Sequence, residues 1–281
     1  TWSVGMYNPC GAWSLGQAFP ASGMPDTYAE NGRNFARGMP FQEGTVVIKL
    51  LNTTADETAV PYLKGTTNWQ ANGHTQLSPT EYDKCEREVR TVHLVQVDIA
   101  VVDSRSPTRW VYSTLAYDGN LPGDNVLDRL TPLGLQFEND RGTFPAVPES
   151  ESQPLHETVL APIDIPEHYG CQNRLAGVVD QPNSSCVSCH MGAFAAVPPD
   201  LNVQGENIPA IFHFDGICTD YNEANAYYFS DYQYPDPFPS GDFDEAIPLD
   251  SSLQLAVAFT QYAIFVNPDA PEPACPNAGS K

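Results

Sequence analysis

The stretch that decides the fold is TVHLVQVDIAVVD, residues 91–103. Its apolar and polar side chains alternate with the two-residue period of a β-strand. One face is mainly apolar and consists of His93, Val95, Val97, Ile99 and Val101. The opposite face is more polar and consists of Leu94, Gln96, Asp98 and Ala100. The sequence therefore predicts one long strand with two chemically different faces.

Three other segments predict strands that accompany it. GTVVIKLLN (44–52) is short, rich in β-branched residues and bounded by glycine and asparagine. RWVYSTLAYDG (109–119) follows a Ser-Arg-Ser-Pro turn and can pair antiparallel with the first strand. LGLQFEN (133–139) is a third partner. Together these segments predict an antiparallel β core over residues 41–140 and a β-rich fold of the α+β class.

The composition limits the partners of this chain. Its 281 residues include 41% hydrophobic side chains, enough for a substantial core. Thirteen Lys and Arg against 35 Asp and Glu give a net charge of −22, which repels phosphate backbones and anionic lipid surfaces. We therefore expect no nucleic-acid partner. No run approaches the roughly 20 apolar residues of a membrane helix, so no transmembrane segment is predicted.

The motif CVSCH, residues 186–190, carries the chemistry. A Cys-x-x-Cys-His run indicates covalent haem c, with Cys186 and Cys189 as thioether attachments and His190 as the proximal iron ligand. A zinc site would need two more ligands at matching spacing, and a thioredoxin-like pair would need an α/β pattern. The sequence shows neither the two extra zinc ligands nor the α/β pattern, although a zinc site and a thioredoxin-like pair remain alternatives.

Five further cysteines suit an oxidising compartment, and covalent haem attachment in bacteria also takes place outside the cytoplasm. They are Cys10, Cys85, Cys171, Cys218 and Cys275. An odd number permits at most two disulfides and one spare thiol, and the sequence leaves the pairing open. The predicted location is periplasmic or extracellular.

The sixth iron ligand decides the class of chemistry. Met191 is adjacent to His190 and cannot reach the opposite side of the iron, while Met6, Met24 and Met39 lie far upstream. A second histidine is one alternative; the candidates are His74, His93, His156, His168 and His213, with His93 and His213 as the main ones. An open position that binds small molecules is the other.

The predicted strand 44–52 contains an unusual lysine. Val47, Lys49 and Leu51 share one face, and Val46, Ile48 and Leu50 share the other. Both faces are otherwise apolar, which predicts a strand buried on both sides. A buried unpaired ammonium is costly. Lys49 therefore reaches the sheet edge, pairs with a carboxylate or haem propionate, or is a neutral functional lysine.

The pattern Phe41-x-Glu43-Gly44-Thr45-Val46-x-Ile48-Lys49 resembles a strand of the cytochrome P-460 family, Phe-x-Asp-Gly-Thr-Val-x-Val-Lys. Members of that family, including those similar to cytochrome c′-beta, are β-rich monohaem c-type proteins. The order of segments is similar too, through 92–118 and 185–192 to AFTQY at 258–262. The resemblance implies that Lys49 is cross-linked to haem.

The resemblance also implies chemistry on a small nitrogen compound. It would be hydroxylamine oxidation if an acid/base group lies over the iron and nitric oxide binding if none does. The sequence departs from the family by a leucine after Lys49, a long insertion after the haem motif and no clear match for the distal acidic residue. The predicted distal pocket is lined by His93, Val95 and Val97, with Trp110, Tyr112 and Thr114 as further candidates.

The remaining segments complete a single predicted haem-binding domain over residues 1–281. Segments rich in Gly and Pro predict loops at 1–40 and 143–169, and an irregular insertion at 197–249. Haem attachment falls in 180–196, where the motif is expected to begin a short helix over 191–196. A C-terminal helix is predicted over 250–267, with Asp250 or Ser251 as N-cap.

Two functions from different classes fit these patterns. One is an exported haem protein that binds or oxidises a small nitrogen compound. The other is an electron-transfer cytochrome, or an accessory subunit of a larger redox assembly, without catalysis. Both imply haem c with its iron and a redox partner protein, and the first also implies a small-molecule ligand.

Overall fold

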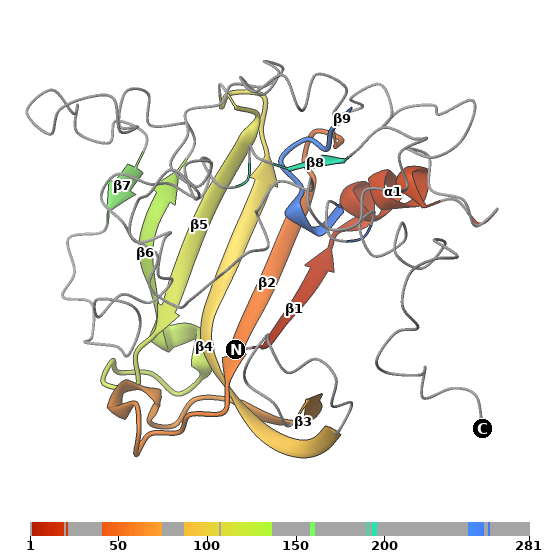
Figure 1. Ribbon diagram of the computed structural model, residues 1–281. Coiled ribbons are helices and arrows are strands. Elements are labelled where there is room, and N and C mark those ends of the chain that lie inside the picture. Colours follow the sequence, from red (N-terminus) through yellow and green to blue (C-terminus); the bar gives the residue numbers. More distant parts are fainter. Residues whose placement is uncertain are drawn as a thin grey trace, which may run out of the picture.

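An antiparallel sheet of seven strands forms the described part of the chain (Figure 1). The computed structural model describes residues 2–19, 21, 41–74, 87–106, 108–136, 158–160, 190, 193–195, 247–255 and 258. Six strands follow the order β1-β2-β4-β5-β6-β7, and β3 pairs with β4. The bounds are β1 Trp2–Tyr7, β2 Val46–Thr53, β3 Asn68–His74, β4 Arg87–Val102, β5 Trp110–Tyr117, β6 Leu130–Gln136 and β7 Thr158–Leu160. The predicted β-rich antiparallel fold is confirmed.

The central strand β4 contains a bulge that the alternation pattern does not reveal. Leu51 of β2 pairs with Gln96, but the next residue, Asn52, pairs with Leu94, so that Val95 is an extra residue in β4. An extra residue reverses the faces on either side of it. His93 therefore lies on the face opposite Val97. The prediction that they share a face is wrong.

The two faces of the sheet differ in chemistry. We call the first the inner face; its cross-strand rows are Tyr7–Val47–Ala100–Tyr112, Gly5–Lys49–Asp98–Thr114 and Leu51–Gln96–Ala116. We call the second the outer face; its rows are Val46–Val101–Val111, Met6–Ile48–Ile99–Ser113–Leu135 and Val4–Leu50–Val97–Leu115. All charged side chains in these rows belong to the inner face.

The main core covers one end of the inner face. It contains Ala18, Phe41, Val102, Trp110, Tyr112, Ala193, Leu249 and Leu255. The helix α1 (Pro9–Ala18) and the small sheet of β8 (Phe194–Ala195) and β9 (Ile247–Pro248) lie near this end, beside β1 and β2 (Figure 1). Residues 46–51 of β2 are only half-buried, which corrects the prediction of a strand buried on both sides.

A second cluster closes the opposite end of the outer face. It consists of Val60, Tyr62, Leu63 and Tyr117, with Val95 packed against it. Two short 3-10 helices lie here, η3 (Pro61–Leu63) and η5 (Val126–Arg129). The amide of Gly119 donates to the carbonyl of Tyr62 at 2.7 Å, which fixes the turn after β5 against η3.

Three regular elements, β1, α1 and β7, occupy residues predicted to be loop. β1 pairs with β2 along its whole length, and α1 follows directly. Asn8 caps α1, since its side-chain oxygen accepts from the amide of Gly11 at 3.1 Å, and Pro9 occupies the first turn. β7 likewise lies within the predicted loop 143–169. The loop prediction for these residues was wrong.

The haem-bearing helix is not confirmed, and the C-terminal helix is confirmed only in part. His190 is helical, but Ala193 is not and Phe194–Ala195 forms β8, so the helix predicted over 191–196 is wrong for all of its described residues. Residues 253–255 and 258 are helical, and the rest of the helix predicted to end at 267 lies outside the described residues. Its cap is Ser252, whose hydroxyl accepts from the amide of Leu255 at 3.3 Å, instead of Asp250 or Ser251. Among the described residues, no helix has the length and apolar character to span a membrane.

Candidate functional site

His190 lies on the inner face, between a strand and a turn that is distant in sequence. Its ring packs on Tyr112 of β5 with centroids 4.6 Å apart. Its Nδ1 is 2.8 Å from the carbonyl oxygen of Ser251. A carbonyl only accepts, so Nδ1 carries the hydrogen and Nε2 keeps its lone pair. This is the tautomer in which a histidine binds a metal through Nε2.

The surroundings also keep this imidazole neutral. Burial lowers the pKa of His190 to about 4, with a smaller contribution from the positive charge of Lys49, and the hydrogen bond to Ser251 opposes this only in part. A neutral imidazole is the ligating form. The effect of Lys49 also shows that its ammonium lies within electrostatic reach of His190. The structure thus brings two of the predicted site residues together.

A buried ion pair holds the turn that accepts the His190 hydrogen bond. Asp250 and Ser251 adopt left-handed backbone conformations with φ of 47° and 61°. The Asp250 carboxylate accepts from the amide of Phe41 at 2.6 Å and from Nη1 of Arg109 at 3.0 Å. Arg109 donates in addition to the carbonyl of Phe41 at 2.8 Å. Left-handed residues persist where surrounding contacts fix them, and the Asp250–Arg109 pair provides such contacts here.

A polar row crosses the same face beside Tyr112. Lys49 of β2 is the direct cross-strand partner of Asp98 in β4, which in turn pairs with Thr114 of β5. One carboxylate oxygen of Asp98 accepts from Nε2 of Gln96 at 2.8 Å and from Oγ1 of Thr114 at 2.9 Å. The inner face therefore carries an oriented carboxylate next to a lysine.

Asp98 is the residue that the sequence reasoning missed. The distal pocket was assigned to the apolar face of 91–103, with Val95 and Val97, but these lie on the other side of the sheet from His190. The reason is that the polar face of this strand points inward. The sequence did contain a signal for Asp98, because antiparallel pairing of the predicted strands 44–52 and 91–103 places a carboxylate opposite Lys49.

The other predicted residues divide into three groups. Trp110, Tyr112 and Thr114 lie on the inner face, and Tyr112 contacts the His190 ring itself. His93 lies near Asp56, seven residues along β4 from Ala100 or about 23 Å at ~3.3 Å per residue, so the fold does not bring it to His190. Cys186, Cys189, His156, His168 and His213 are outside the described residues, as is the side chain of His74.

The described methionine also fails to approach the site. Met6 lies on the outer face of β1 and is 45% exposed. It therefore lies on the opposite face of the sheet from His190. Met24, Met39 and Met191 are outside the described residues, so the expectation that an ordinary His/Met cytochrome is disfavoured stays a prediction.

Comparisons with protein-family models, curated proteins and solved structures found no match for this chain. The described residues also contain no group of three or more His, Cys, Asp or Glu side chains that could hold a metal ion. The interpretation of the site therefore depends on the geometry around His190.

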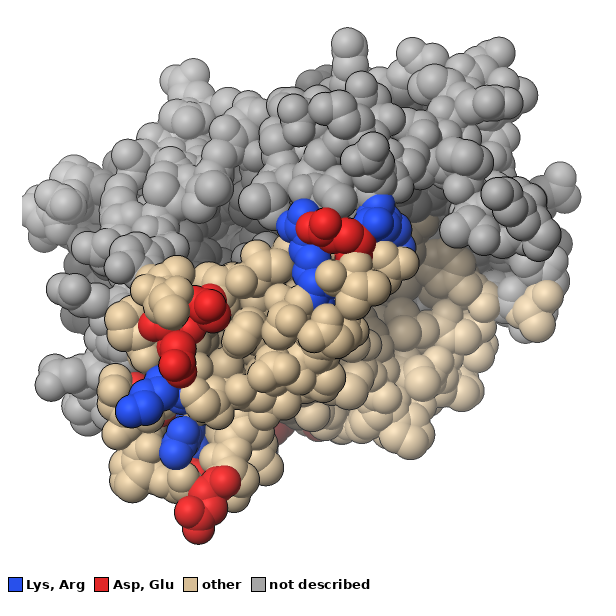
Figure 2. Space-filling model, turned by 90° about the horizontal axis from the view of Figure 1, so that it is seen from below, with Lys and Arg blue, Asp and Glu red and all other residues tan. Residues whose placement is uncertain are grey.

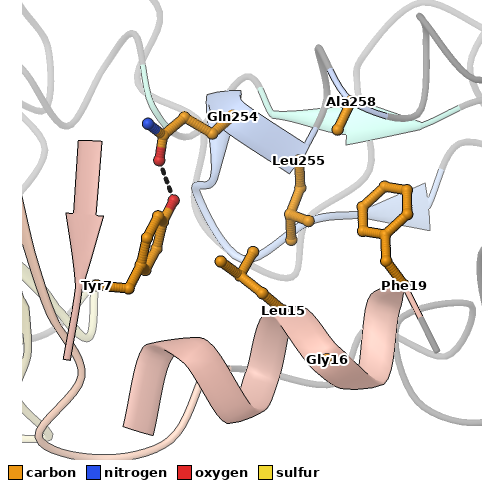
Figure 3. A pocket seen from close by; sticks show the side chains of 7 residues that line it. All are labelled: Tyr7, Leu15, Gly16, Phe19, Gln254, Leu255 and Ala258. Carbon is orange, nitrogen blue, oxygen red and sulfur yellow. Dashed lines mark hydrogen bonds between the residues drawn. The ribbon is translucent and has the colours of Figure 1, made fainter. Parts of the chain in front are cut away.

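A hollow of about 460 Å³ lies next to the turn that holds His190 (Figure 3). It is lined by Tyr7, Leu15, Gly16, Phe19, Gln254, Leu255 and Ala258. The Tyr7 hydroxyl points to the side-chain oxygen of Gln254 and donates a hydrogen bond to it (Figure 3). Burial raises the pKa of Tyr7, so this donor stays protonated at neutral pH.

Aromatic rings connect this hollow with His190. Tyr7 stacks on Phe41 at 6.4 Å, and Phe41 meets the edge of Trp110 at 5.6 Å. Trp110 stacks on Tyr112 at 6.0 Å, and Tyr112 contacts His190. These rings form one continuous series through the core between the imidazole and the wall of the hollow.

Proposed function

We propose that the chain is an exported monohaem c-type protein that binds or oxidises a small nitrogen compound. The observation that supports this most is the state of His190. Its imidazole is neutral and half-buried, and its Nδ1 donates to the carbonyl of Ser251 so that Nε2 is available as a ligand. The motif CVSCH gives this histidine its adjacent thioether cysteines.

The residues present fit a covalent haem on the inner face. Cys186 and Cys189 would hold it through thioethers, and His190 would bind the iron. Lys49, on the same face and within electrostatic reach of His190, would provide the third protein bond that the family resemblance implies. The bound haem would supply an iron that coordinates the substrate nitrogen and accepts its electrons.

Asp98 supplies the acid/base group that decides between oxidation and simple binding. Hydroxylamine oxidation requires removal of protons from nitrogen and oxygen, and a positioned carboxylate accepts them. The donors from Gln96 and Thr114 fix one oxygen of Asp98 and so fix the orientation of its carboxyl group. We therefore favour hydroxylamine oxidation over nitric oxide binding alone.

The test is Asp98→Asn in the haem-loaded protein, measured by hydroxylamine turnover and by nitric oxide binding. Loss of a general base lowers turnover by about 10²–10⁴-fold, whereas nitric oxide affinity is expected to stay within about twofold. Asp103→Asn is the matched control, since Asp103 lies just beyond the same strand and pairs with the exposed Arg105. It should change neither quantity.

Three results would contradict this proposal. If Asp98→Asn turns over hydroxylamine at the wild-type rate, the carboxylate is not the base and the nitric oxide function is favoured. A bis-histidine spectrum that neither hydroxylamine nor nitric oxide changes would exclude both functions. Absence of covalent haem from the intact protein would exclude the class altogether.

The aromatic series favours the second candidate, an electron-transfer cytochrome or an accessory redox subunit. It connects His190 with a hollow at whose edge Phe19 is exposed, a position at which a redox partner could dock. Trp110→Leu interrupts the series. An electron carrier should then reduce its partner more slowly, while a hydroxylamine-oxidising enzyme tested with a small soluble acceptor should keep its rate.

A further inference from the structure

The outer face is almost entirely apolar. Its three rows contain eleven aliphatic or methionine side chains and one serine; they are Val46, Val101, Val111, Met6, Ile48, Ile99, Ser113, Leu135, Val4, Leu50, Val97 and Leu115. None of these positions is charged, although the chain carries 48 charged Lys, Arg, Asp and Glu side chains, 13 plus 35. The charged side chains of this chain therefore lie outside these three rows.

This distribution is the reverse of what a half-covered antiparallel sheet normally shows. Such a sheet packs its apolar face on the core and turns its polar face to solvent. Here the inner face carries Lys49 and Asp98, and the outer face remains accessible. Val4 is 55% exposed, Met6 45% and Leu135 41%, while most of the others are half-buried. An apolar face of this kind marks an interaction surface.

The charged side chains of the described part gather in places. Seen from below, its Lys, Arg, Asp and Glu side chains are largely confined to two groups, and much of the remaining described surface in this view is uncharged (Figure 2). The second core cluster closes only one end of the outer face, around Tyr62 and Tyr117.

The size of the face suits a weak, reversible protein contact. Its twelve positions, with ~4.8 Å between strands and ~6.8 Å between rows, define a patch of about 400 Å². Two such patches bury on the order of 800 Å², before the uneven surface of the side chains adds to it. This is below the total of about 1,000 Å² that a stable, specific interface needs, and it is in the range of transient contacts.

We propose that two copies of this chain pack outer face against outer face as a homodimer. A twisted, uncharged sheet is self-complementary, and two such sheets stack about 10 Å apart in a β-sandwich. The net charge of −22 makes other contacts between copies repulsive and also opposes an anionic membrane. The outer face is where two acidic copies meet without opposing like charges.

This arrangement is independent of the proposed haem function. It places the two inner faces, with His190 and Asp98, on opposite sides of the dimer, so that each site keeps its own access to solvent. It also buries the apolar edge residues of β1 and β6, Met6 and Leu135.

The experiment is sedimentation velocity on the full chain over a hundredfold range of concentration. Met6→Glu and Leu135→Glu each place two charges in a symmetric dimer interface, one from each copy. Because both side chains are well exposed in one copy, neither change should unfold it. Trp13→Glu is the matched control, since Trp13 is 46% exposed, much as Met6 is, and belongs to α1, which lies near the core of the inner face.

The wild-type chain is expected to shift from monomer to dimer as its concentration rises. Each of the two outer-face variants should raise the dissociation constant at least tenfold, and Trp13→Glu should change it less than twofold. A wild-type chain that is monomeric throughout the range would overturn the proposal. So would a dimer unaffected by either outer-face variant, because another surface would then hold it together.

Discussion

Asp250→Asn removes one negative charge from a buried ion pair and is expected to lower the free energy of unfolding by about 3 kcal/mol. The side chain of Asp250 is 4% exposed and that of Arg109 28%. Asparagine keeps an oxygen for the amide of Phe41 and tolerates the left-handed φ of 47°, so the backbone can stay as it is. What is lost is the charge that balances Arg109.

The magnitude follows from desolvation. Burial raises the pKa of Asp250 despite the attraction of Arg109, so the whole pair contributes little net stability. Removing one partner is different, because it leaves the other charge buried and uncompensated at a cost of about 3–5 kcal/mol. Partial exposure of Arg109 places the expected value at the lower end of that range.

The assay is urea denaturation at neutral pH of Asp250→Asn, Arg109→Gln and the double variant. Each single change leaves one uncompensated group, whereas the double variant leaves none. The loss in free energy of unfolding for the double variant should therefore be smaller than the sum of the two single losses by at least about 2 kcal/mol. Asp103→Asn is the matched control. Its partner Arg105 is 89% exposed, and such surface pairs contribute about 0–1 kcal/mol.

Two results would refute this reasoning. A loss below about 1 kcal/mol for Asp250→Asn would mean that the pair is effectively solvated. Additive losses in the double variant would mean that Asp250 and Arg109 act separately, and the turn that presents Ser251 to His190 would then need another explanation.

Three further changes test other parts of the structure. Lys49→Ala should remove the third protein–haem bond, seen as a shift in the denatured haem spectrum, whereas an unchanged spectrum would argue against a cross-link. Burial raises the pKa of Tyr62 from 10 to about 12. The folded state therefore favours the neutral hydroxyl, and the free energy of unfolding should fall by about 2 kcal/mol as the pH rises from 10 to 12. Tyr62→Phe should abolish that fall in alkaline denaturation curves. A Cβ on Gly119 would meet two carbonyl oxygens at 2.3 and 2.9 Å, so Gly119→Ala should lower the free energy of unfolding by more than about 2 kcal/mol. Gly16 in α1 has open space around it, so Gly16→Ala should raise the free energy of unfolding by about 0.5–1 kcal/mol. Thermal unfolding measures both changes.

The strands could be predicted where the period-2 signal is local. The segment 91–103 has the alternation of a strand and its hairpin partner follows at once, so β4 and β5 were found. The bulge at Val95 has no such signal, because it depends on how β2 is paired. β1 was missed since Gly5 weakens its pattern; in the structure this glycine faces the side chain of Gln254.

The candidate site was predictable only where a motif marks it. CVSCH identified His190, and the family resemblance identified Lys49. Asp98 was assigned correctly to the polar face of its strand, but the site was expected on the apolar face, because apolar residues were expected to point inward and the sequence cannot show which face of a sheet is covered. The Asp250–Arg109 pair joins positions 141 apart, and no local pattern reports such a contact.

The contacts around His190 also set the order in which the site can form. Phe41 and Asp250 are 209 positions apart, and Tyr7 and Gln254 are 247 apart, whereas β4 and β5 are joined by a short turn. Contacts between distant positions form late, since the entropy of closing a long loop is lost before the contact stabilises the chain. The sheet can therefore form first, while its inner face is still exposed to solvent. The His190 imidazole gains its hydrogen bond to Ser251 only when residues 247–255 dock, so this part of the site forms late in the folding of the chain.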